Sequence, residues 1–181
     1  MRKKIEPEFL NYIIDQKIAP GARLPTLAQM SDEIGISVGK LREQLEVARS
    51  RGLVSVKPRL GTQREPFNFL PVTRDSVLFG LASGEAEFEH FSELRQAIES
   101  GLWMPAVTRL QSEDHETLRH LVAQAWEKLY GDPVLIPNLE HRQLHLTIFQ
   151  RLDNPFVKGI LEAYWDIYET CLLYTSDAAD E

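Results

Sequence analysis

The chain has 181 residues, a formal net charge of −7, 43% hydrophobic residues and a single cysteine. No apolar run approaches the roughly 18 to 20 residues that span a bilayer, and the N-terminus has no hydrophobic signal core, so the sequence predicts a cytoplasmic protein with no membrane contact. One cysteine excludes an intrachain disulfide and any metal site built from several cysteines.

Charge is divided unevenly along the chain. Residues 1–69 contain 12 Lys and Arg against 8 Asp and Glu, a net charge of +4, whereas residues 70–181 contain 8 against 19, a net charge of −11. We therefore predict a basic domain followed by an acidic one. Clustered Lys and Arg suit a nucleic acid because they neutralise phosphates and release counterions. For any single Lys, an ordinary solvated charge is the alternative.

Two short helices are predicted first. The helix over residues 9–15 has its apolar side chains on one face: Phe9, Leu10, Ile13 and Ile14. Thr26 and Gln29 then fit a capping box, in which each side chain bonds the backbone N–H of the other residue. This box begins a second helix, which ends near Gly35.

A third helix is predicted from Ser37, which is a good N-cap residue. Its buried face repeats at helical spacing: Val38, Leu41, Leu45 and Ala48. The residues that fall away from this face near the N-terminal end are Gly39, Lys40, Arg42 and Glu43. That end of the second helix of a helix-turn-helix enters the DNA major groove, so these residues are candidate readers.

After Gly52 the period changes from that of a helix to that of a strand. Val54 and Val56 share one face of residues 53–57 and are predicted to be half-buried together. Pro58 to Gly61 form a turn in which glycine permits positive φ. Three helices followed by this hairpin predict a winged helix-turn-helix, with Lys57 and Arg59 near the tip of the wing.

These residues resemble the DNA-binding domain of GntR-type regulators. The likeness is carried by Pro20-Gly21-Ala22-Arg23-Leu24-Pro25, Gly35-Ile36-Ser37, Leu41-Arg42-Glu43-Gln44-Leu45 and Gly52-Leu53-Val54. It implies a homodimer that places two recognition helices on a palindromic double-stranded DNA operator. With the wing included, the predicted DNA-binding residues are Ser37, Gly39, Lys40, Arg42, Lys57, Arg59, Gly61 and Thr62. Ala28 and Val38 stand where many members carry a DNA-contacting arginine, so an operator sequence does not transfer.

Residues 1–64 are predicted to form the DNA-binding domain, which we call the head. The rest of the chain divides into three parts. Residues 65–74 contain Pro66 and Pro71 with little helical period, and are predicted to be a linker. Residues 75–170 are predicted to be a partial helical domain. The last eleven residues, 171–181, resemble the translation of a transposase adapter used in DNA sequencing libraries, and a native acidic tail is the alternative. An adapter would mean that the helical domain is truncated near Thr170.

Four amphipathic helices are predicted in this second domain: residues 88–102, 112–129, about 141–152 and 155–168. Mostly short connections favour an antiparallel bundle, so the fold class is mainly α with a small β wing. The three tryptophans, Trp103, Trp126 and Trp165, are predicted to lie in the core.

The second domain resembles the FCD effector-binding domain that often follows a GntR-type head. The residues that carry the likeness are Arg95-Gln-Ala-Ile-Glu99, the segment 112–129, His141-Arg-Gln-Leu-His145 and Asn154-Pro155. Many members hold a divalent metal, such as zinc or nickel, on one aspartate and three histidines. By this likeness His145 matches the first histidine, His141 occupies the aspartate position, and two more histidines would lie beyond Thr170.

The metal hypothesis has a structural alternative. Residues four apart share a helix face, so His141 and His145 can converge on one ion. They can equally be a structural pair bonded to backbone or to Glu140. Two ligands rarely hold an ion, so a divalent metal such as zinc is a candidate cofactor of a full-length parent and is not expected in residues 1–170 alone.

Arg95 and Glu99 also lie four residues apart, and two interpretations remain open. They can form an intrahelical ion pair, or Arg95 can point into the effector pocket that the resemblance implies, where a guanidinium suits a carboxylate.

The leading functional hypothesis is a transcriptional regulator controlled by a small-molecule or metal effector. The alternatives are a helical protein-interaction module and a metal-dependent enzyme. Arg142 occupies the place of the glutamate in a His-Glu-x-x-His motif, so we predict no enzyme activity.

Overall fold

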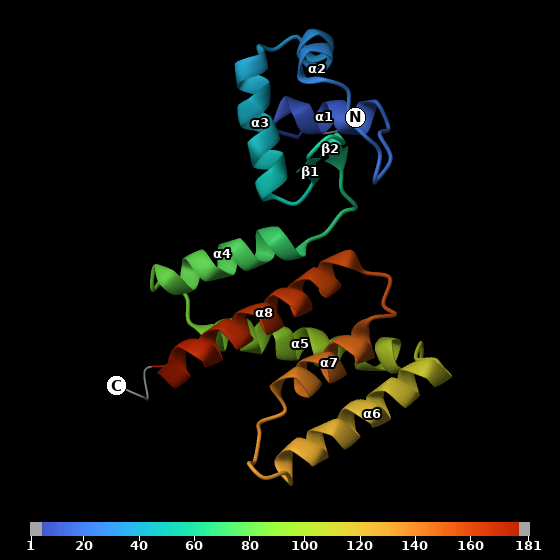
Figure 1. The fold of residues 1–181 in the computed structure, drawn as a ribbon, viewed down its shortest axis with the longest axis vertical. Coiled ribbons are helices and arrows are strands. Elements are labelled where there is room, and N and C mark those ends of the chain that lie inside the picture. Colours follow the sequence, from blue (N-terminus) through green and yellow to red (C-terminus); the bar gives the residue numbers. More distant parts are fainter. Residues whose placement is uncertain (1–4, 178–181) are drawn as a thin grey trace. The chain divides into compact units, whose positions relative to one another are not determined.

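The computed structural model describes residues 5–177, with side chains described through Thr170, and it divides into two units, residues 1–72 and 73–181. The fold is mainly helical, as the sequence predicted: a winged helix-turn-helix with a two-stranded wing comes first, and a helical bundle follows (Figure 1). No helix among the described residues is long and apolar enough to cross a bilayer.

The described part of the first unit contains three complete helices and one hairpin. Its elements are α1 (Glu8–Asp15), α2 (Leu27–Ile34), α3 (Val38–Ser50), β1 (Val54–Lys57) and β2 (Gly61–Arg64). Helices α1 and α2 pack on α3 and on each other (Figure 1). The side chains at the centre of this core are fully buried: Phe9, Met30, Leu41 and Val54. Ile14 was predicted to lie on the buried apolar face of α1, but it is 40% exposed.

Local capping explains where α2 begins and ends. The predicted capping box is present: the backbone N–H of Gln29 donates to Thr26 Oγ1 at 3.3 Å, and that of Thr26 donates to Gln29 Oε1 at 3.0 Å. Gly35 ends the helix in the left-handed region, with φ of 78°. Glycine reaches this conformation without the steric cost of a Cβ.

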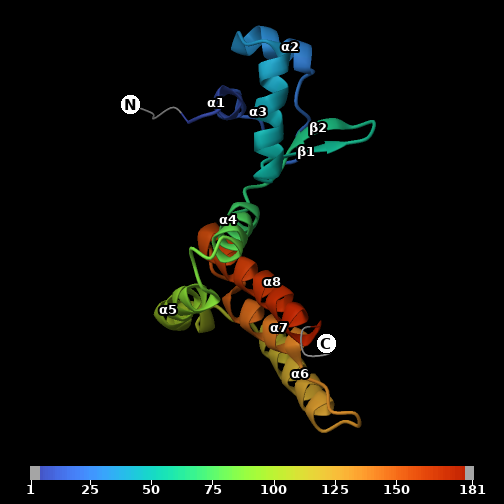
Figure 2. The same cartoon turned by 90° about the vertical axis from the view of Figure 1, so that its left-hand side faces the viewer.

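The wing is an antiparallel pair in which Val54 lies opposite Arg64 and Lys57 opposite Gly61. Val54 is 2% exposed, but Val56 is 53% exposed, so the predicted shared burial of the two valines is wrong. Burial does not alternate along β1 but decreases from Val54 to Lys57, and the hairpin projects from α3 (Figure 2).

Part of the predicted linker is helical. Helix α4 (Leu70–Ala82) begins inside residues 65–74, which corrects the expectation for that segment. Asn68 Oδ1 accepts the N–H of Leu70 at 2.9 Å, and Pro71 stands in the first turn, where the missing N–H costs no helical hydrogen bond. No residue of α4 is buried, which is why its sequence carries little apolar period.

The second unit continues with α5 (Phe88–Val107), α6 (Ser112–Leu129), α7 (Asn138–Phe149) and α8 (Pro155–Asp177). Helices α6 and α7 lie side by side, and α8 packs on α5 and α7 (Figure 1). Predicted starts at 88, 112 and 155 are confirmed, whereas α7 begins three residues before His141. The core contains Ala106, Ile148, Phe149, Leu152, Val157 and Leu161.

Only one of the three tryptophans is buried. Trp165 is 1% exposed, but Trp103 and Trp126 are 47% and 52% exposed, so the prediction for these two is wrong. The described helices cover only about half of each of these two side chains.

Two polar contacts fix the ends of α7 and α8. Asp114, at the start of α6, is 3% exposed and accepts from Gln150 Nε2 at 2.7 Å and from the Arg151 guanidinium. Arg151 and the backbone N–H of Gln111 hold the pKa of Asp114 below its ordinary value. Asn154 Oδ1 accepts from the N–H of Val157 at 3.2 Å, which caps the first turn of α8.

The predicted adapter segment, residues 171–181, lies outside the residues whose side chains the structure describes. Helix α8 continues through part of it, to Asp177. Its origin stays a prediction.

Candidate DNA-binding surface and effector site

The N-terminal end of α3 presents backbone donors and small side chains. Ser37 Oγ accepts the N–H of Lys40 at 3.2 Å, so the predicted N-cap is present, while the hydroxyl hydrogen is left to donate elsewhere. Gly39 is exposed, and a Cβ built on it would meet nothing nearer than Ser37 Oγ at 3.9 Å. A helix N-terminus with unpaired N–H groups favours a phosphate, and the bare backbone at Gly39 allows one to approach.

Lys40 is already paired with a carboxylate from another helix. Its Nζ lies 2.8 Å from Oε1 of Glu8, in the first turn of α1. Gln44 Nε2 donates to the other oxygen of Glu8, and Gln44 Oε1 accepts the N–H of Phe9 at 2.9 Å. The Lys40 hydrogen bond is the largest of the causes that lower the pKa of Glu8 from 4.5 to about 2. Sequence reasoning missed Glu8, which stands 32 residues from its partner.

Arg42 differs from Lys40 in having no partner in the part of the chain that the structure describes. It is exposed and forms no hydrogen bond or ion pair with the described residues. Arg49, at the other end of α3, instead pairs with Glu46 at 2.7 Å. Arg42 is therefore a free cation in the first turns of α3, where the sequence predicted a reader.

The wing adds a second group of cations. Arg59 is exposed at the tip, with φ of 66°, and Lys57 Nζ lies 3.7 Å from Glu65 Oε1. Gly61 has φ of 77°, which confirms the predicted positive φ. Thr62 contributes its carbonyl to the structure of the wing, since it accepts the N–H of Leu24 at 2.8 Å.

Arg23 is a basic residue between α1 and α2 that lies beside the wing, and the sequence did not assign it to DNA. Its Nε lies 3.2 Å from the position that a Cβ on Gly61 would occupy, so its guanidinium covers the backbone of the tip. Backbone bonds hold it there: Gly21 N–H donates to Arg64 O at 2.7 Å, and Arg64 N–H donates to Ala22 O at 2.9 Å. Only this pairing of residues 21–24 with β2 reveals the position, and the local sequence carries no signal for it.

A polar cluster lies in the helical unit, where α5, α7 and α8 meet. Arg95 on α5 donates to Glu99 Oε2 at 2.8 Å, which confirms the intrahelical pair. The other oxygen of Glu99 lies 3.0 Å from Nδ1 of His145, on α7. These side chains are mostly buried, between 12% and 22% exposed.

Aromatic rings surround Arg95. Its guanidinium carbon lies 4.8 Å from the ring centre of Tyr164 and 5.8 Å from that of Trp165, both on α8. Three buried donors have no partner among the described residues: Arg95 Nε and Trp165 Nε1 in this cluster, and Arg142 Nε, whose other nitrogens pair with Asp166 and Glu169. Unpaired buried donors are costly and therefore mark a site where an acceptor is expected.

The two predicted metal-binding histidines are brought together. The ring centres of His141 and His145 lie 4.9 Å apart, and each ring lies within 5.0 Å of Trp165. Desolvation and the nearby charges of His145 and Arg95 lower the pKa of His141, which favours the neutral form that binds metals. Glu140 is not their partner, because Lys128 Nζ donates to it at 2.9 Å.

The described residues alone do not complete a metal site. No cluster of three or more His, Cys, Asp or Glu with suitable geometry occurs in the part of the chain that the structure describes. The bond between His145 and Glu99 nevertheless resembles the outer contact of a metal-binding histidine, in which a carboxylate holds one ring nitrogen and leaves the other for the ion.

Comparison with known proteins identifies both halves of the chain. Residues 2–63 match the family described as bacterial regulatory proteins of the gntR family, and residues 90–181 match the FCD domain. The chain belongs to the GntR family of transcriptional regulators, with an FCD domain. Members of this family are regulators and not enzymes, so the absence of enzyme activity predicted from the motif agrees with the family.

Individual relatives of this GntR-family chain are distant. The HTH-type transcriptional regulator YieP of Escherichia coli (strain K12) is 25% identical over 194 aligned residues, which cover 94% of this chain and 79% of YieP. YcbG of Bacillus subtilis (strain 168), also an HTH-type transcriptional regulator, is 23% identical, with 90% and 66% covered. A solved structure, Streptococcus agalactiae GntR, shares the fold with a TM-score of 0.56 at 17% identity, covering 87% of this chain and 75% of that one. The chain spans only part of each.

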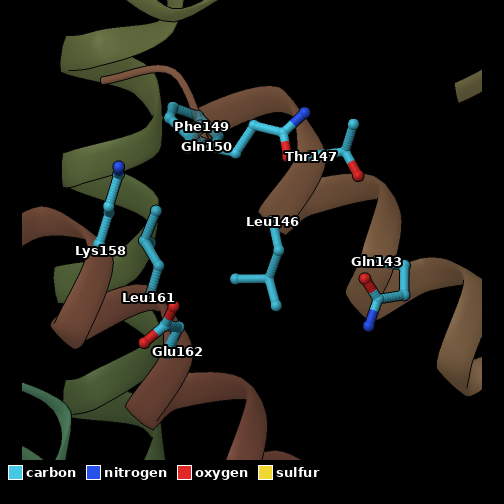
Figure 3. Close-up of a pocket in the computed structure, with 8 residues that line it drawn as sticks. All are labelled: Gln143, Leu146, Thr147, Phe149, Gln150, Lys158, Leu161 and Glu162. Carbon is cyan, nitrogen blue, oxygen red and sulfur yellow. The ribbon is translucent and has the colours of Figure 1, made fainter. Parts of the chain in front are cut away.

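The FCD domain also carries a groove between α7 and α8, with a volume of about 270 Å³ (Figure 3). It is lined by Gln143, Leu146, Thr147, Phe149, Gln150, Lys158, Leu161 and Glu162. At 3.6 residues per turn, Gln143 and Gln150 lie on the side of α7 opposite to His141 and His145. This groove is therefore separate from the polar cluster around Arg95.

Proposed function

We propose that this DNA-binding transcriptional regulator acts as a homodimer and responds to a small molecule whose carboxylate binds beside Arg95. Effector binding would change how the two heads engage a palindromic operator. Such control is a coupling between two sites, so it requires that the effector bind the DNA-competent and DNA-incompetent states with different affinities.

The observation that carries the effector proposal is the pair of unpaired donors on Arg95 and Trp165. Glu99 uses only one nitrogen of the guanidinium, and Nε is buried without an acceptor among residues 5–170. A carboxylate offers two oxygens, and its charge-assisted bonds to a guanidinium are among the stronger hydrogen bonds in proteins. The rings of Tyr164 and Trp165 supply apolar surface for the rest of a small molecule.

The DNA-binding part of the proposal is tested by a gel-shift titration of the full chain against genomic operator fragments at two salt concentrations. We expect binding that weakens steeply with salt, because phosphate contacts release counterions. Binding that is independent of salt would favour the alternative of a helical protein-interaction module. A palindromic duplex should bind two chains, as equilibrium sedimentation would show.

The effector part is tested by repeating the titration with a panel of mono- and dicarboxylates. The most effective carboxylate should lose its effect in Arg95→Gln and keep it in Arg119→Gln, which removes an exposed arginine of the same domain. An unchanged response of Arg95→Gln would reject the site while leaving DNA binding intact.

A divalent metal is the second candidate effector, and the Glu99–His145 bond supports it. His141 and His145 would hold the ion, and further ligands would have to come from outside the described residues. Zinc titration of the full-length protein, followed by calorimetry, should give weaker binding in His145→Ala than in His115→Ala, which removes an exposed histidine of α6. Equal zinc affinity in the two variants would reject this candidate.

A further inference from the structure

The contact between α1 and α3 bears directly on DNA binding, because it occupies Lys40. An isolated exposed ion pair would be of little consequence, since long side chains readily exchange partners. Here Glu8 is held from two sides, by Lys40 Nζ at 2.8 Å and by the amide of Gln44. Gln44 is itself fixed, being 7% exposed and bonded to the backbone of Phe9. The carboxylate is therefore positioned, even though half of its surface is exposed.

We propose that Glu8 is an internal competitor of the DNA backbone for Lys40, and that it lowers the affinity of the head for nonspecific DNA. This inference rests on the proposed DNA-binding function. Glu8 is a positioning residue, since it acts through Lys40 and through the charge that it presents next to α3.

Two arrangements are possible when DNA approaches, and both reduce the contribution of Lys40. If Lys40 stays with Glu8, it neutralises no phosphate and releases no counterion. If Lys40 turns to a phosphate, it leaves a carboxylate that repels the DNA backbone and attracts a cation from solution. Nonspecific binding depends almost entirely on phosphate neutralisation, so either arrangement weakens it. Base contacts at an operator are less affected, and the ratio of specific to nonspecific affinity rises.

The pair persists over the whole working range of pH. Its partners hold the pKa of Glu8 at about 2, so the carboxylate stays ionised well below neutral pH. The competition is thus a constant property of the head and not a pH switch.

The test is a salt titration of full-length protein binding to a random-sequence duplex, which requires no knowledge of the operator. Glu8→Gln keeps the size of the side chain and an oxygen for Gln44 but removes the charge. We expect the magnitude of the slope of log K against log salt to rise by about 0.9, the value for one additional neutralised phosphate. Between about 200 and 50 mM salt, this adds roughly threefold to the gain in affinity.

Glu46→Gln is the matched control. It makes the same change of charge on α3 and also frees a cation, Arg49, but at the far end of the helix. Lys40→Met should lower the slope little in the wild-type background and by about 0.9 in the Glu8→Gln background. Competition is indicated if Lys40→Met changes the salt slope more in Glu8→Gln than in wild type. Loss of a merely structural contact would instead lower the melting temperature and leave this difference absent.

The outcomes separate the inference from the function on which it rests. Equal slopes for wild type, Glu8→Gln and Glu46→Gln would overturn the competition while leaving DNA binding in place. Should Glu8→Gln fail to fold, Lys40→Met alone decides: a loss of about 0.9 in the wild-type slope would mean that Lys40 is already free to bind phosphate. Absence of salt-dependent binding in the wild type would overturn both proposals.

Discussion

Two glycines of the candidate DNA surface are expected to respond oppositely to the same substitution. Gly39 lies in the first turn of α3 with helical backbone, and a Cβ added there would have no neighbour within 3.9 Å. Gly61 has φ of 77°, and its added Cβ would lie 3.2 Å from Arg23 Nε. The first site tolerates alanine in the folded head, and the second does not.

The magnitudes follow from backbone energetics. Alanine in a helix is favoured over glycine by roughly 0.5 to 1 kcal/mol, and the first turn should realise the lower end of this range. A non-glycine residue in the left-handed region costs roughly 1 to 2 kcal/mol, to which displacement of Arg23 adds. Gly39→Ala should therefore raise the melting temperature of the head by a few degrees, and Gly61→Ala should lower it by roughly 4 to 16 °C.

For Gly39→Ala, DNA affinity and thermal stability are expected to change in opposite directions. If a phosphate approaches the backbone at Gly39, the stabilised Gly39→Ala variant binds DNA more weakly, whereas an effect through folding would strengthen binding. Calorimetric melting and gel-shift titration of the same preparations measure both quantities. A destabilised Gly39→Ala head would refute the reasoning from open space, and unchanged DNA affinity would refute the close approach.

Three further predictions concern single residues. Arg42→Ala should weaken operator binding by roughly 1 to 3 kcal/mol if Arg42 reaches a base edge, with the melting temperature unchanged, whereas equal losses for Arg49→Ala would show only a general charge effect. Met30→Ala should destabilise the head by roughly 2 to 5 kcal/mol in chemical denaturation, because Met30 is 0% exposed, and a smaller loss would mean that the core collapses around it. Glu8 has a lower pKa folded than unfolded, so head stability should fall as the pH drops from 4.5 towards about 2, and denaturant midpoints of Glu8→Gln should show a weaker decline.

Local signals explain what could be predicted from the sequence. Thr26, Gln29 and Ser37 specify helix starts through bonds that span three residues, so neighbouring positions are enough to find them. The apolar period correctly placed α5, α6 and α8 for the same reason. Val56 shows the limit of this reasoning: alternation tells which face a side chain occupies, but not how far the opposing core extends beneath it.

Long-range contacts explain what could not be predicted. From its neighbours in sequence, Lys40 is predicted to be an unpaired cation on the surface of α3, because none of them indicates Glu8. The pairing becomes visible only when α1 is placed beside α3. Arg23 gains its position at the wing through pairing with a strand about forty residues later in the chain. For Trp103 and Trp126 the sequence predicted burial that the structure does not show. A large apolar side chain is buried only where another element covers it.

The two interpretations of Arg95 left open by the sequence are not exclusive. A guanidinium has five N–H donors, and the ion pair with Glu99 accounts for only one nitrogen. Glu99 in turn divides its two oxygens between Arg95 and His145, so it orients both side chains at once. A carboxylate at the proposed site would not need to displace Glu99, because Arg95 Nε and the indole N–H of Trp165 have no partner among the described residues. Under the proposed function, the intrahelical pair is compatible with effector binding, because it positions Arg95 and leaves Nε without a partner among the described residues.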